Sequence, residues 1–222
     1  MQRVRLRFLR GEELKYLGHL DLTRLWERAL RRAGVPLAYS AGYTPHARLS
    51  LAAPLPVGVT SECELMDVVL ERALLPADLA LAINQALPAG LRVLEAWEVP
   101  LALPSLQASV RFAEYEVVSA GSCSCPEGPP GAIAAFLAAE QVPWEQRRDG
   151  QPRRYDLRRL VDTLWVEGQQ PDGWRLGMRL RQDTEGAGRA EQVTAALGFA
   201  EPPLSIHRRR LLLAEPGQDG HG

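Results

Sequence analysis

Two histidines, two tyrosines and a lysine lie in two short segments near the start of the chain, and together they could perform acid–base chemistry. Lys15, Tyr16 and His19 precede a helical pattern, and Tyr43 and His46 follow it. Histidine can both donate and accept a proton near neutral pH. Without a metal ion, one histidine could deprotonate a 2′-hydroxyl group while the other protonates the leaving oxygen of a phosphodiester. His19 and His46 are therefore the candidate catalytic residues.

The same residues also have structural explanations. His19 stands at the expected start of a helix, where it could cap or pack, and Asp21 stands in the first turn, where the helix dipole favours a carboxylate. His46 follows a proline in a loop and could be an ordinary surface residue. Binding of an anionic ligand such as RNA is the broader expectation. The residues expected to contact it are Lys15, Tyr16, His19, Asp21, Arg24, Arg28, Arg31, Tyr43, His46 and Arg48.

Arginines also alternate with apolar residues in two segments that have the pattern of strands. The first set is Arg3, Arg5 and Arg7, and the second is Arg175, Arg179 and Arg181, with Arg208 and Arg210 on the last expected strand. If helices cover one face of each sheet, the other face would present guanidinium groups suited to a phosphate backbone. Alternatively, Glu62 and Glu64 on a neighbouring strand form cross-strand ion pairs with Arg5 and Arg7.

Several common catalytic and binding patterns are missing from the sequence. It contains no GxGxxG, P-loop, HExxH or GxSxG motif. The turn around Gly58 could cradle a phosphate, although a hairpin connection is the better explanation. Cys63, Cys123 and Cys125 are too few and too scattered for a disulfide framework. A zinc site needs about four ligands, so we expect no metal site.

The composition is that of a globular protein, with 46% hydrophobic and 24% charged residues in 222. No apolar run approaches the roughly 20 residues that span a bilayer, and the N-terminus lacks the apolar core of a signal peptide. We therefore expect a cytoplasmic protein without a membrane partner. The net charge of −1 hides an asymmetry, because residues 1–50 carry +6 and residues 51–150 carry −8. Such a local field can steer a charged partner.

The spacing of apolar residues predicts the elements of the first half. Strict alternation over residues 2–9 is typical of a half-buried strand. A helix is expected over residues 19–33, with Gly34 at its end. The remaining expected elements are an irregular strand over 36–53 interrupted by a loop at 42–45, a strand over 62–70, a helix over 76–87 and a strand over 91–99. This order is that of a ferredoxin-like domain.

The second half repeats the order with weaker signals. Its expected elements are a strand over 110–119, a helix over 131–141, a hairpin of strands 163–169 and 174–182, a helix over 188–197 and a strand over 205–213. We therefore predict an α+β fold of two tandem ferredoxin-like (βαββαβ) domains with antiparallel sheets. The domains are residues 1–100 and 105–214, joined by a proline-spaced linker and followed by a disordered tail, 215–222. A single mixed α+β domain is the alternative.

Several motifs in the first third of the chain carry a family resemblance. The chain closely resembles the radical-SAM-linked (radical-SAM-associated) protein family, a bacterial family without an established function. This chain departs from the family pattern at two positions. Gly18 stands where the family usually has serine, which removes a helix cap, and Tyr43 stands where the family usually has phenylalanine. The matching motifs are His19-Leu20-Asp21-Leu22, Arg24, Arg31-Arg32, Tyr39-Ser40, Gly42-Tyr43-Thr44-Pro45-His46, Leu55-Pro56-Val57-Gly58 and Ser61-Glu62.

Members of that family are encoded beside, or fused to, a radical SAM protein, often near ribonuclease and ribosomal-protein genes. The resemblance implies an accessory role in a radical SAM reaction, with RNA modification as one such reaction. The 4Fe-4S cluster and SAM would belong to the partner enzyme, and this chain would bind no cofactor. The expected layout also resembles that of CRISPR repeat-processing endoribonucleases, an analogy of fold alone.

The sequence thus favours a non-catalytic partner of a radical SAM enzyme that binds RNA or presents a substrate. A metal-independent endoribonuclease that uses His19 and His46 is the alternative. A protein-interaction module without RNA affinity is a third possibility. The first two predictions require the two histidine-bearing segments to converge beside the arginine-rich helix in one concave site.

Overall fold

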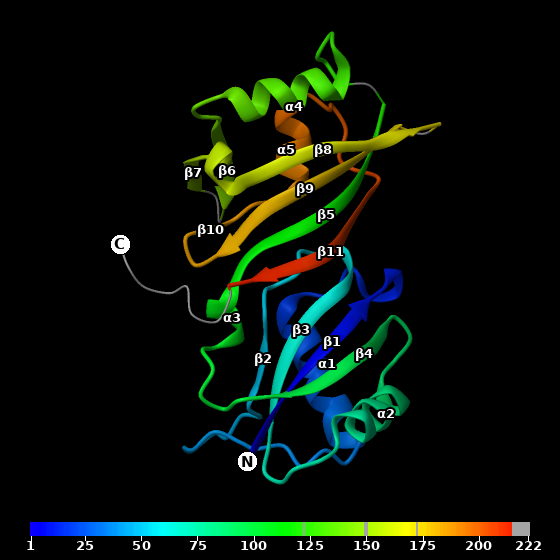
Figure 1. Ribbon diagram of the computed structural model, residues 1–222, viewed down its shortest axis with the longest axis vertical. Coiled ribbons are helices and arrows are strands. Elements are labelled where there is room, and N and C mark those ends of the chain that lie inside the picture. The colour runs from blue at the N-terminus through cyan, green and yellow to red at the C-terminus, as the bar shows by residue number, and fades with distance from the viewer. Residues whose placement is uncertain (122, 149–150, 172, 215–222) are drawn as a thin grey trace. The chain divides into compact units, whose positions relative to one another are not determined.

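The computed structural model describes residues 1–121, 123–148, 151–171 and 173–214, and the chain divides into two compact units (Figure 1). The first unit comprises Met1–Val110 with residues 213–214, and the second comprises Arg111–Leu212. The fold is mixed α+β, and its strands pair mostly antiparallel. The predicted tail, residues 215–222, lies outside the described residues.

The first unit has the predicted order of strand, helix, strand, strand, helix and strand. Its strands lie side by side in the order β2-β3-β1-β4, and each neighbouring pair is antiparallel. The long helices α1 and α2 pack on one face of this sheet. The elements are β1 (Gln2–Arg10), the 3-10 helix η1 (Glu12–Leu14), α1 (His19–Arg32), β2 (Leu49–Leu51), β3 (Thr60–Leu70), α2 (Pro76–Ala86), β4 (Leu91–Val99) and α3 (Leu106–Ser109).

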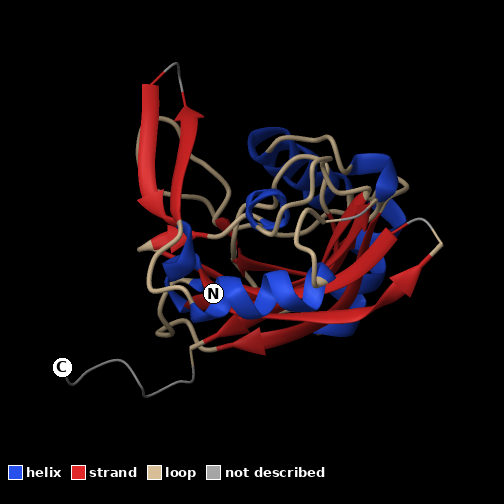
Figure 2. Cartoon of the chain, turned by 90° about the horizontal axis from the view of Figure 1, so that it is seen from above, coloured by secondary structure: helices blue, strands red, loops and turns tan. Residues whose placement is uncertain are grey.

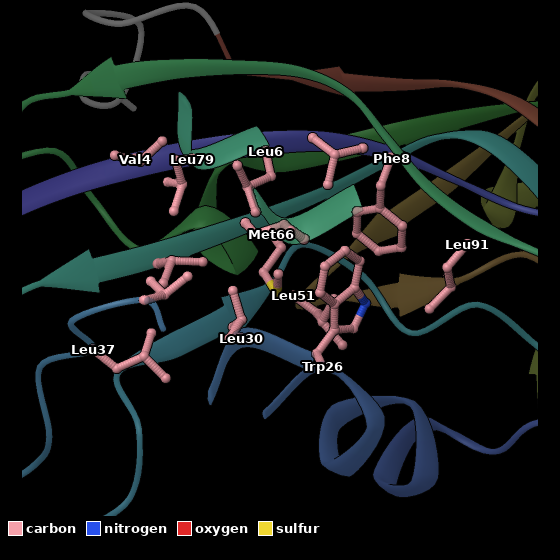
Figure 3. Close-up of a cluster of buried hydrophobic side chains, with 14 of the residues drawn as sticks. Val4, Leu6, Phe8, Trp26, Leu30, Leu37, Leu51, Met66, Leu79 and Leu91 are labelled. Carbon is pink, nitrogen blue, oxygen red and sulfur yellow. The ribbon is translucent and has the colours of Figure 1, made fainter. Parts of the chain in front are cut away.

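The core of the first unit lies between the sheet and these two helices (Figure 3). Val4, Leu6 and Phe8 project from β1 into this core and are fully buried. Trp26 of α1 packs edge-on against Phe8, with 4.8 Å between the ring centroids. Helix α1 can pack in this way because its apolar residues recur at helical spacing, which leaves its arginines on the outside.

The other face of β1 carries its arginines, and two of them share one buried carboxylate. Asp67 of β3 accepts hydrogen bonds from Arg3 (Nη2···Oδ2 2.6 Å) and from Arg5 (Nε···Oδ1 2.7 Å). The side chains of all three residues are at most 10% exposed. Antiparallel pairing explains the contact with Arg5, because the register sets Arg5 directly opposite Asp67.

The third arginine of β1 is paired at the surface. Arg7 lies opposite Glu95 of β4, and the Nη2···Oε1 distance is 2.7 Å. The hydrogen bond from Arg7 lowers the pKa of Glu95, and Glu95 in turn raises the pKa of Arg7. The counter-charges of Arg3, Arg5 and Arg7 in these contacts are therefore Asp67 and Glu95, whereas the sequence pointed to Glu62 and Glu64.

Residues 100–104, which the sequence suggested as a linker, pack against the first unit. Arg3 reaches across the sheet face, and its Nη1 and Nη2 donate to the carbonyl oxygens of Leu103 (2.8 Å) and Pro104 (3.0 Å). The division between the units falls later, after Val110. The guanidinium of Arg3 thus connects β1, β3 and the segment after β4.

The second unit repeats the alternation of strands and helices. β9 lies between β5 on one side and β8 with β10 on the other, and β11 lies beside β5. Helix α4 begins three residues earlier than predicted, because its first turn accepts the two prolines that follow Gly128. The elements are β5 (Val110–Ala120), α4 (Gly128–Ala138), β6 (Pro143–Arg148), β7 (Gln151–Asp156), the 3-10 helix η2 (Leu157–Leu160), β8 (Val161–Gln170), β9 (Gly173–Asp183), β10 (Gly186–Ala187), α5 (Ala190–Ala196) and β11 (Ser205–Leu213).

A hairpin in the second unit was not predicted. β6 and β7 pair with each other in a separate two-stranded sheet, seen in Figure 2 as two neighbouring strands with a grey connection. At its base the hydroxyl of Tyr155 donates to Gln192 Oε1 (2.6 Å), and Asp156 Oδ1 accepts from the backbone of Val142 (2.9 Å). The signal was missed because this segment is polar on both faces, so no apolar alternation marks it.

Replacing the shared counter-charge should destabilise the first unit strongly. Asp67→Asn keeps the shape of the side chain but leaves two buried guanidinium groups without a carboxylate, so we expect a loss of about 3–5 kcal/mol in the free energy of unfolding. Urea denaturation followed by circular dichroism measures this loss.

The matched control is Glu95→Gln, which removes the exposed carboxylate that pairs with Arg7, also of β1. This variant should change the denaturation midpoint far less. If the two variants lose equal stability, the buried contact of Arg3 and Arg5 with Asp67 contributes no more to stability than the exposed pair of Arg7 and Glu95.

Candidate functional site

Arg10 organises the segment that precedes α1. Its buried side chain, 1% exposed, donates from Nε to the carbonyl oxygen of Leu14 (3.0 Å) and from Nη2 to those of Lys15 (2.5 Å) and Leu17 (2.9 Å). One guanidinium group thus binds three backbone carbonyl groups of a turn that lies outside the strand pairing of the sheet. Arg10 was not among the residues predicted for the site, although it ends the arginine alternation of β1.

The segment around Gly58 joins this turn. The amide of Gly58 donates to the carbonyl oxygen of Lys15 at 2.7 Å, so two motif segments that are some 40 residues apart in the sequence meet in space. Gly58 has a φ of +87°, a conformation that favours glycine. Such a backbone suits the tight connection that leads from β2 into β3.

The joined segments expose apolar and polar side chains beside the first turn of α1. Tyr16 is 73% exposed, Leu20 68% and Val57 59%, and His19 is exposed as well. Gly18 occupies the N-cap position and provides no side-chain hydrogen bond, as the departure from the family pattern implied. The first amide groups of α1 therefore have no side-chain cap in this position.

Lys15 is held as a cation in this region. Its Nζ lies 2.7 Å from Glu12 Oε2 and 5.3 Å from the centre of the Tyr16 ring. The hydrogen bond with Glu12 raises the pKa of Lys15, so its ammonium group keeps its proton at neutral pH. Lys15 is suited to contact an anion and not to act as a base.

The predicted binding residues of α1 lie on its outer side. Arg24, Arg28 and Arg31 are exposed, as is Asp21 in the first turn. Asp21 and Arg24 approach to 3.5 Å, and Glu27 and Arg31 to 3.7 Å. Arg28 has no ion pair within the described part of the chain. Exposed pairs at such distances contribute little, so these guanidinium groups remain available to an external anion.

Ser40 closes the loop that carries Tyr43 and His46. Its amide donates to the carbonyl oxygen of His46 (2.9 Å), and its Oγ accepts from the amide of His46 (3.0 Å). The loop places Tyr43 fully in solvent and leaves His46 and Arg48 exposed. Aromatic and cationic side chains are thus present here too.

The two histidines lie at opposite ends of the first unit. The Ser40 loop is anchored where Val69 pairs with the backbone of Arg48, near the end of β3. The turn before His19 is anchored on Arg10, which pairs with Ser61 at the other end of β3. β1 spans about 26 Å between these ends, and α1 spans about 20 Å.

The prediction that these segments converge in one concave site is therefore wrong. General acid–base catalysis on one phosphodiester requires both groups within about 3 Å of the reacting atoms, directly or through one water. His19 and His46 cannot satisfy that requirement together. The structure does bring together Lys15, Tyr16, His19 and the start of α1, and it separates them from Tyr43, His46 and Arg48.

The second expected arginine face is also paired. Arg179 donates to Glu114 (2.8 Å) and lies 3.4 Å from Asp162, and its pKa is raised mainly by the hydrogen bond with Glu114. Arg175 and Arg181 approach Glu116 and Asp183. Carboxylate partners are thus in place for both predicted sets of strand arginines, in contrast to Arg28 of α1. The sets are Arg3, Arg5 and Arg7 of β1 and Arg175, Arg179 and Arg181 of β9.

No group of three His, Cys, Asp or Glu side chains in the described ranges could hold a metal ion, and the three cysteines are free thiols. Among the same residues, no helix is long and apolar enough to cross a membrane.

A family model matches residues 3–190, and it is described as "Uncharacterized protein conserved in bacteria (DUF2344)". Because the match covers most of the chain, the protein belongs to this family. No curated protein matches the chain. The family description names no radical SAM partner, so that partner stays a prediction.

The comparison with solved structures gives matches of low identity. A chain of a Cbf5-Nop10-Gar1 complex is 12% identical with a TM-score of 0.48, and the alignment covers 94% of this chain and 48% of that one. A chain of an H/ACA RNP bound to a substrate RNA is 12% identical with a TM-score of 0.44, covering 92% and 47%. A RAMP protein that binds different RNA substrates is 10% identical with a TM-score of 0.25, covering 97% and 100%. The chain thus spans about half the length of the first two, and likeness at this level does not define its function.

Replacing Arg10 should loosen the turn before α1. In Arg10→Lys a single ammonium group cannot bind three carbonyl groups in the same geometry. We expect a loss of about 2–3 kcal/mol in the free energy of unfolding and faster hydrogen exchange at the amide of Gly58.

Urea denaturation and amide exchange by NMR measure the two effects. Arg92→Lys, at an exposed position of β4, is the control and should change neither. Unchanged protection of the Gly58 amide in Arg10→Lys would mean that Arg10 does not hold the two motif segments together.

Proposed function

We propose that this member of the family binds single-stranded RNA on its first unit and presents it to a radical SAM enzyme. The contact surface is the outer side of α1 with the turn before it. The observation that carries the proposal is the exposed row of Arg24, Arg28 and Arg31, which recur at intervals of four and three residues and so lie on one side of the helix.

The arginines of α1 differ from those of β1 in how tightly carboxylates bind them. Arg3 and Arg5 each bind a buried carboxylate, and breaking such a contact to bind a phosphate would leave Asp67 buried without its partners. Arg24 and Arg31 have only long, exposed contacts, so exchange of a carboxylate for a phosphate costs little. Phosphate binding by such groups also releases counterions from the nucleic acid.

The distance between the two motif loops favours an extended ligand. Lys15 and Tyr16 precede α1, whereas Tyr43 and His46 lie near its other end. A small ligand could not contact both groups across about 20 Å, whereas an extended polymer could. Exposed tyrosine rings provide stacking surfaces for bases, and this stacking tolerates any base sequence.

The radical SAM partner is supported by the resemblance of the motifs from His19 to Glu62 and not by the structure. In this proposal the partner supplies the 4Fe-4S cluster and SAM, while this chain holds the substrate. Part of the apolar surface formed by Tyr16, Leu20 and Val57 would then be available to that enzyme.

The strand orders support a ferredoxin-like plan in each unit. The first unit has the order β2-β3-β1-β4, and the second has the order β8-β9-β5-β11 when β6, β7 and β10 are left aside. In each set of four, the first and third strands along the chain are central and the second and fourth are outermost. Two tandem ferredoxin-like domains are therefore part of the proposal.

Reversing charge on α1 should weaken RNA binding specifically. We expect Arg24→Glu with Arg28→Glu to lower the affinity for a fluorescein-labelled single-stranded RNA at least about tenfold, and to reduce the slope of log K against log [salt] by about 1.4, since each lost phosphate contact removes about 0.7. Fluorescence anisotropy in EDTA at several salt concentrations measures both, and the RNA should be recovered intact.

The matched control is Arg72→Glu with Arg92→Glu, which changes the total charge equally at exposed positions outside α1. Equal losses in the two double variants would show that only net charge matters and would contradict an interface on α1. RNA cut to products with 2′,3′-cyclic ends would contradict a purely RNA-presenting role and would require catalytic groups other than the pair of His19 and His46.

Co-purification tests the enzyme partner. The tagged full-length chain, isolated under anaerobic conditions from a bacterium that naturally encodes it, should retain a polypeptide that carries the three-cysteine cluster motif of radical SAM enzymes. Mass spectrometry identifies the polypeptide, and iron analysis shows its cluster. Recovery of RNA without such a polypeptide would support RNA binding but remove the radical SAM part of the proposal.

A further inference from the structure

A cavity of about 410 Å³ lies on the face of the first sheet that the long helices leave uncovered. Arg3 and Asp67 line the cavity from the central strands of the sheet. Ser50 lines it from β2, and Arg48 lines it from the position before β2. Leu101 and Leu103 line it from the segment that follows β4. The volume falls within the range of pockets that hold small molecules.

The register explains why these side chains meet. Ser50 pairs with Asp67, and Val69 pairs with Arg3, so their side chains share one face of the antiparallel sheet. The far wall is held in place because Arg3 donates to the carbonyl oxygens of Leu103 and Pro104. The cavity is therefore formed by hydrogen-bonded elements of a single unit.

The charges around the cavity do not cancel. Arg3 and Arg5 share the single carboxylate of Asp67, which leaves one unit of positive charge in a region where these side chains are at most 10% exposed. Asp67 is the only carboxylate among the lining residues, whereas Arg48 adds a second positive charge. Arg48 Nη1 lies 3.6 Å from the sulfur of Met1, a weak acceptor.

The rest of the lining is mostly apolar. Leucine and valine side chains supply it, and the hydroxyl-bearing residues Ser50 and Ser105 stand among them. A strongly hydrated ion would lose its water against such walls. An anion with an apolar body, in contrast, could contact both the arginine side chains and the apolar walls. An excess positive charge beside apolar walls is thus suited to an organic anion.

We propose that this cavity binds a small organic anion, with a carboxylate or phosphate head group at Arg48 and a short apolar body against Leu101 and Leu103. The head group balances the excess charge of the two buried guanidinium groups, and Ser50 and Ser105 lie within the same lining to donate hydrogen bonds. The cavity lies on the opposite face of the sheet from α1, and Arg48 is the one lining residue that is also among the predicted RNA contacts.

The test compares three probes of equal chain length with the full-length protein. Octanoate and octyl phosphate carry the proposed head groups, and octanamide is the neutral control. Isothermal titration calorimetry measures affinity, and leucine methyl signals in NMR spectra locate the bound probe. We expect at least one of the anions to bind at least about tenfold more tightly than octanamide and to shift signals of Leu101 and Leu103. Tighter binding by one anion identifies the head group.

Arg48→Gln tests the role of the exposed cation and is expected to weaken the anion about tenfold without affecting octanamide. Arg92→Gln removes an exposed cation of the same sheet outside the cavity and should leave all three affinities unchanged. Equal affinity for octanoate, octyl phosphate and octanamide would overturn the proposal. So would equal effects of the two variants, or no binding of either anion up to about 10 mM.

Discussion

The contact of Arg3 and Arg5 with Asp67 is the interaction on which the first unit depends. It lies between the two central strands of the sheet, where the three side chains are nearly inaccessible to water. Burial of charge is costly unless each charge has a partner, so this triad excludes any register in which the arginines face the core. The same register places Val4, Leu6 and Phe8 under the helices. One ionic contact thus helps to decide which face of the sheet is covered.

The triad also determines what the uncovered face can do. Arg3 reaches past Asp67 to the segment after β4 and so forms one wall of the cavity. Because its partner Arg5 uses the same carboxylate, an uncompensated positive charge remains at that wall. The structural role of the arginines and the proposed affinity for an anion therefore have one origin, namely two cations and one anion in a buried position.

Arginine has different roles in this chain according to its surroundings. On β1 and β9 the cross-strand register sets arginines near carboxylates, and the pairs Arg7–Glu95 and Arg179–Glu114 result. On α1, Arg24 and Arg31 project from the helix and have only long contacts with carboxylates of the same helix. Arg10 has a third role, because it binds backbone carbonyl groups of a turn. Residue type alone does not separate a counter-ion from a nucleic-acid contact.

The sequence by itself determined the elements that have a clear period. Alternation in β1 and helical spacing in α1 follow from side-chain direction within one element, so they can be read locally. The exposed arginines of α1 were predicted on the same basis, whereas the missing cap at Gly18 was implied by the family resemblance. The β6–β7 hairpin lacked a period and was missed. The tertiary structure alone decided which distant residues meet: it joined Gly58 to Lys15, gave Arg5 the carboxylate of Asp67, and placed His19 and His46 at opposite ends of the sheet. These relations depend on strand register and chain direction, which are set by the packing of the whole unit and not by any short segment.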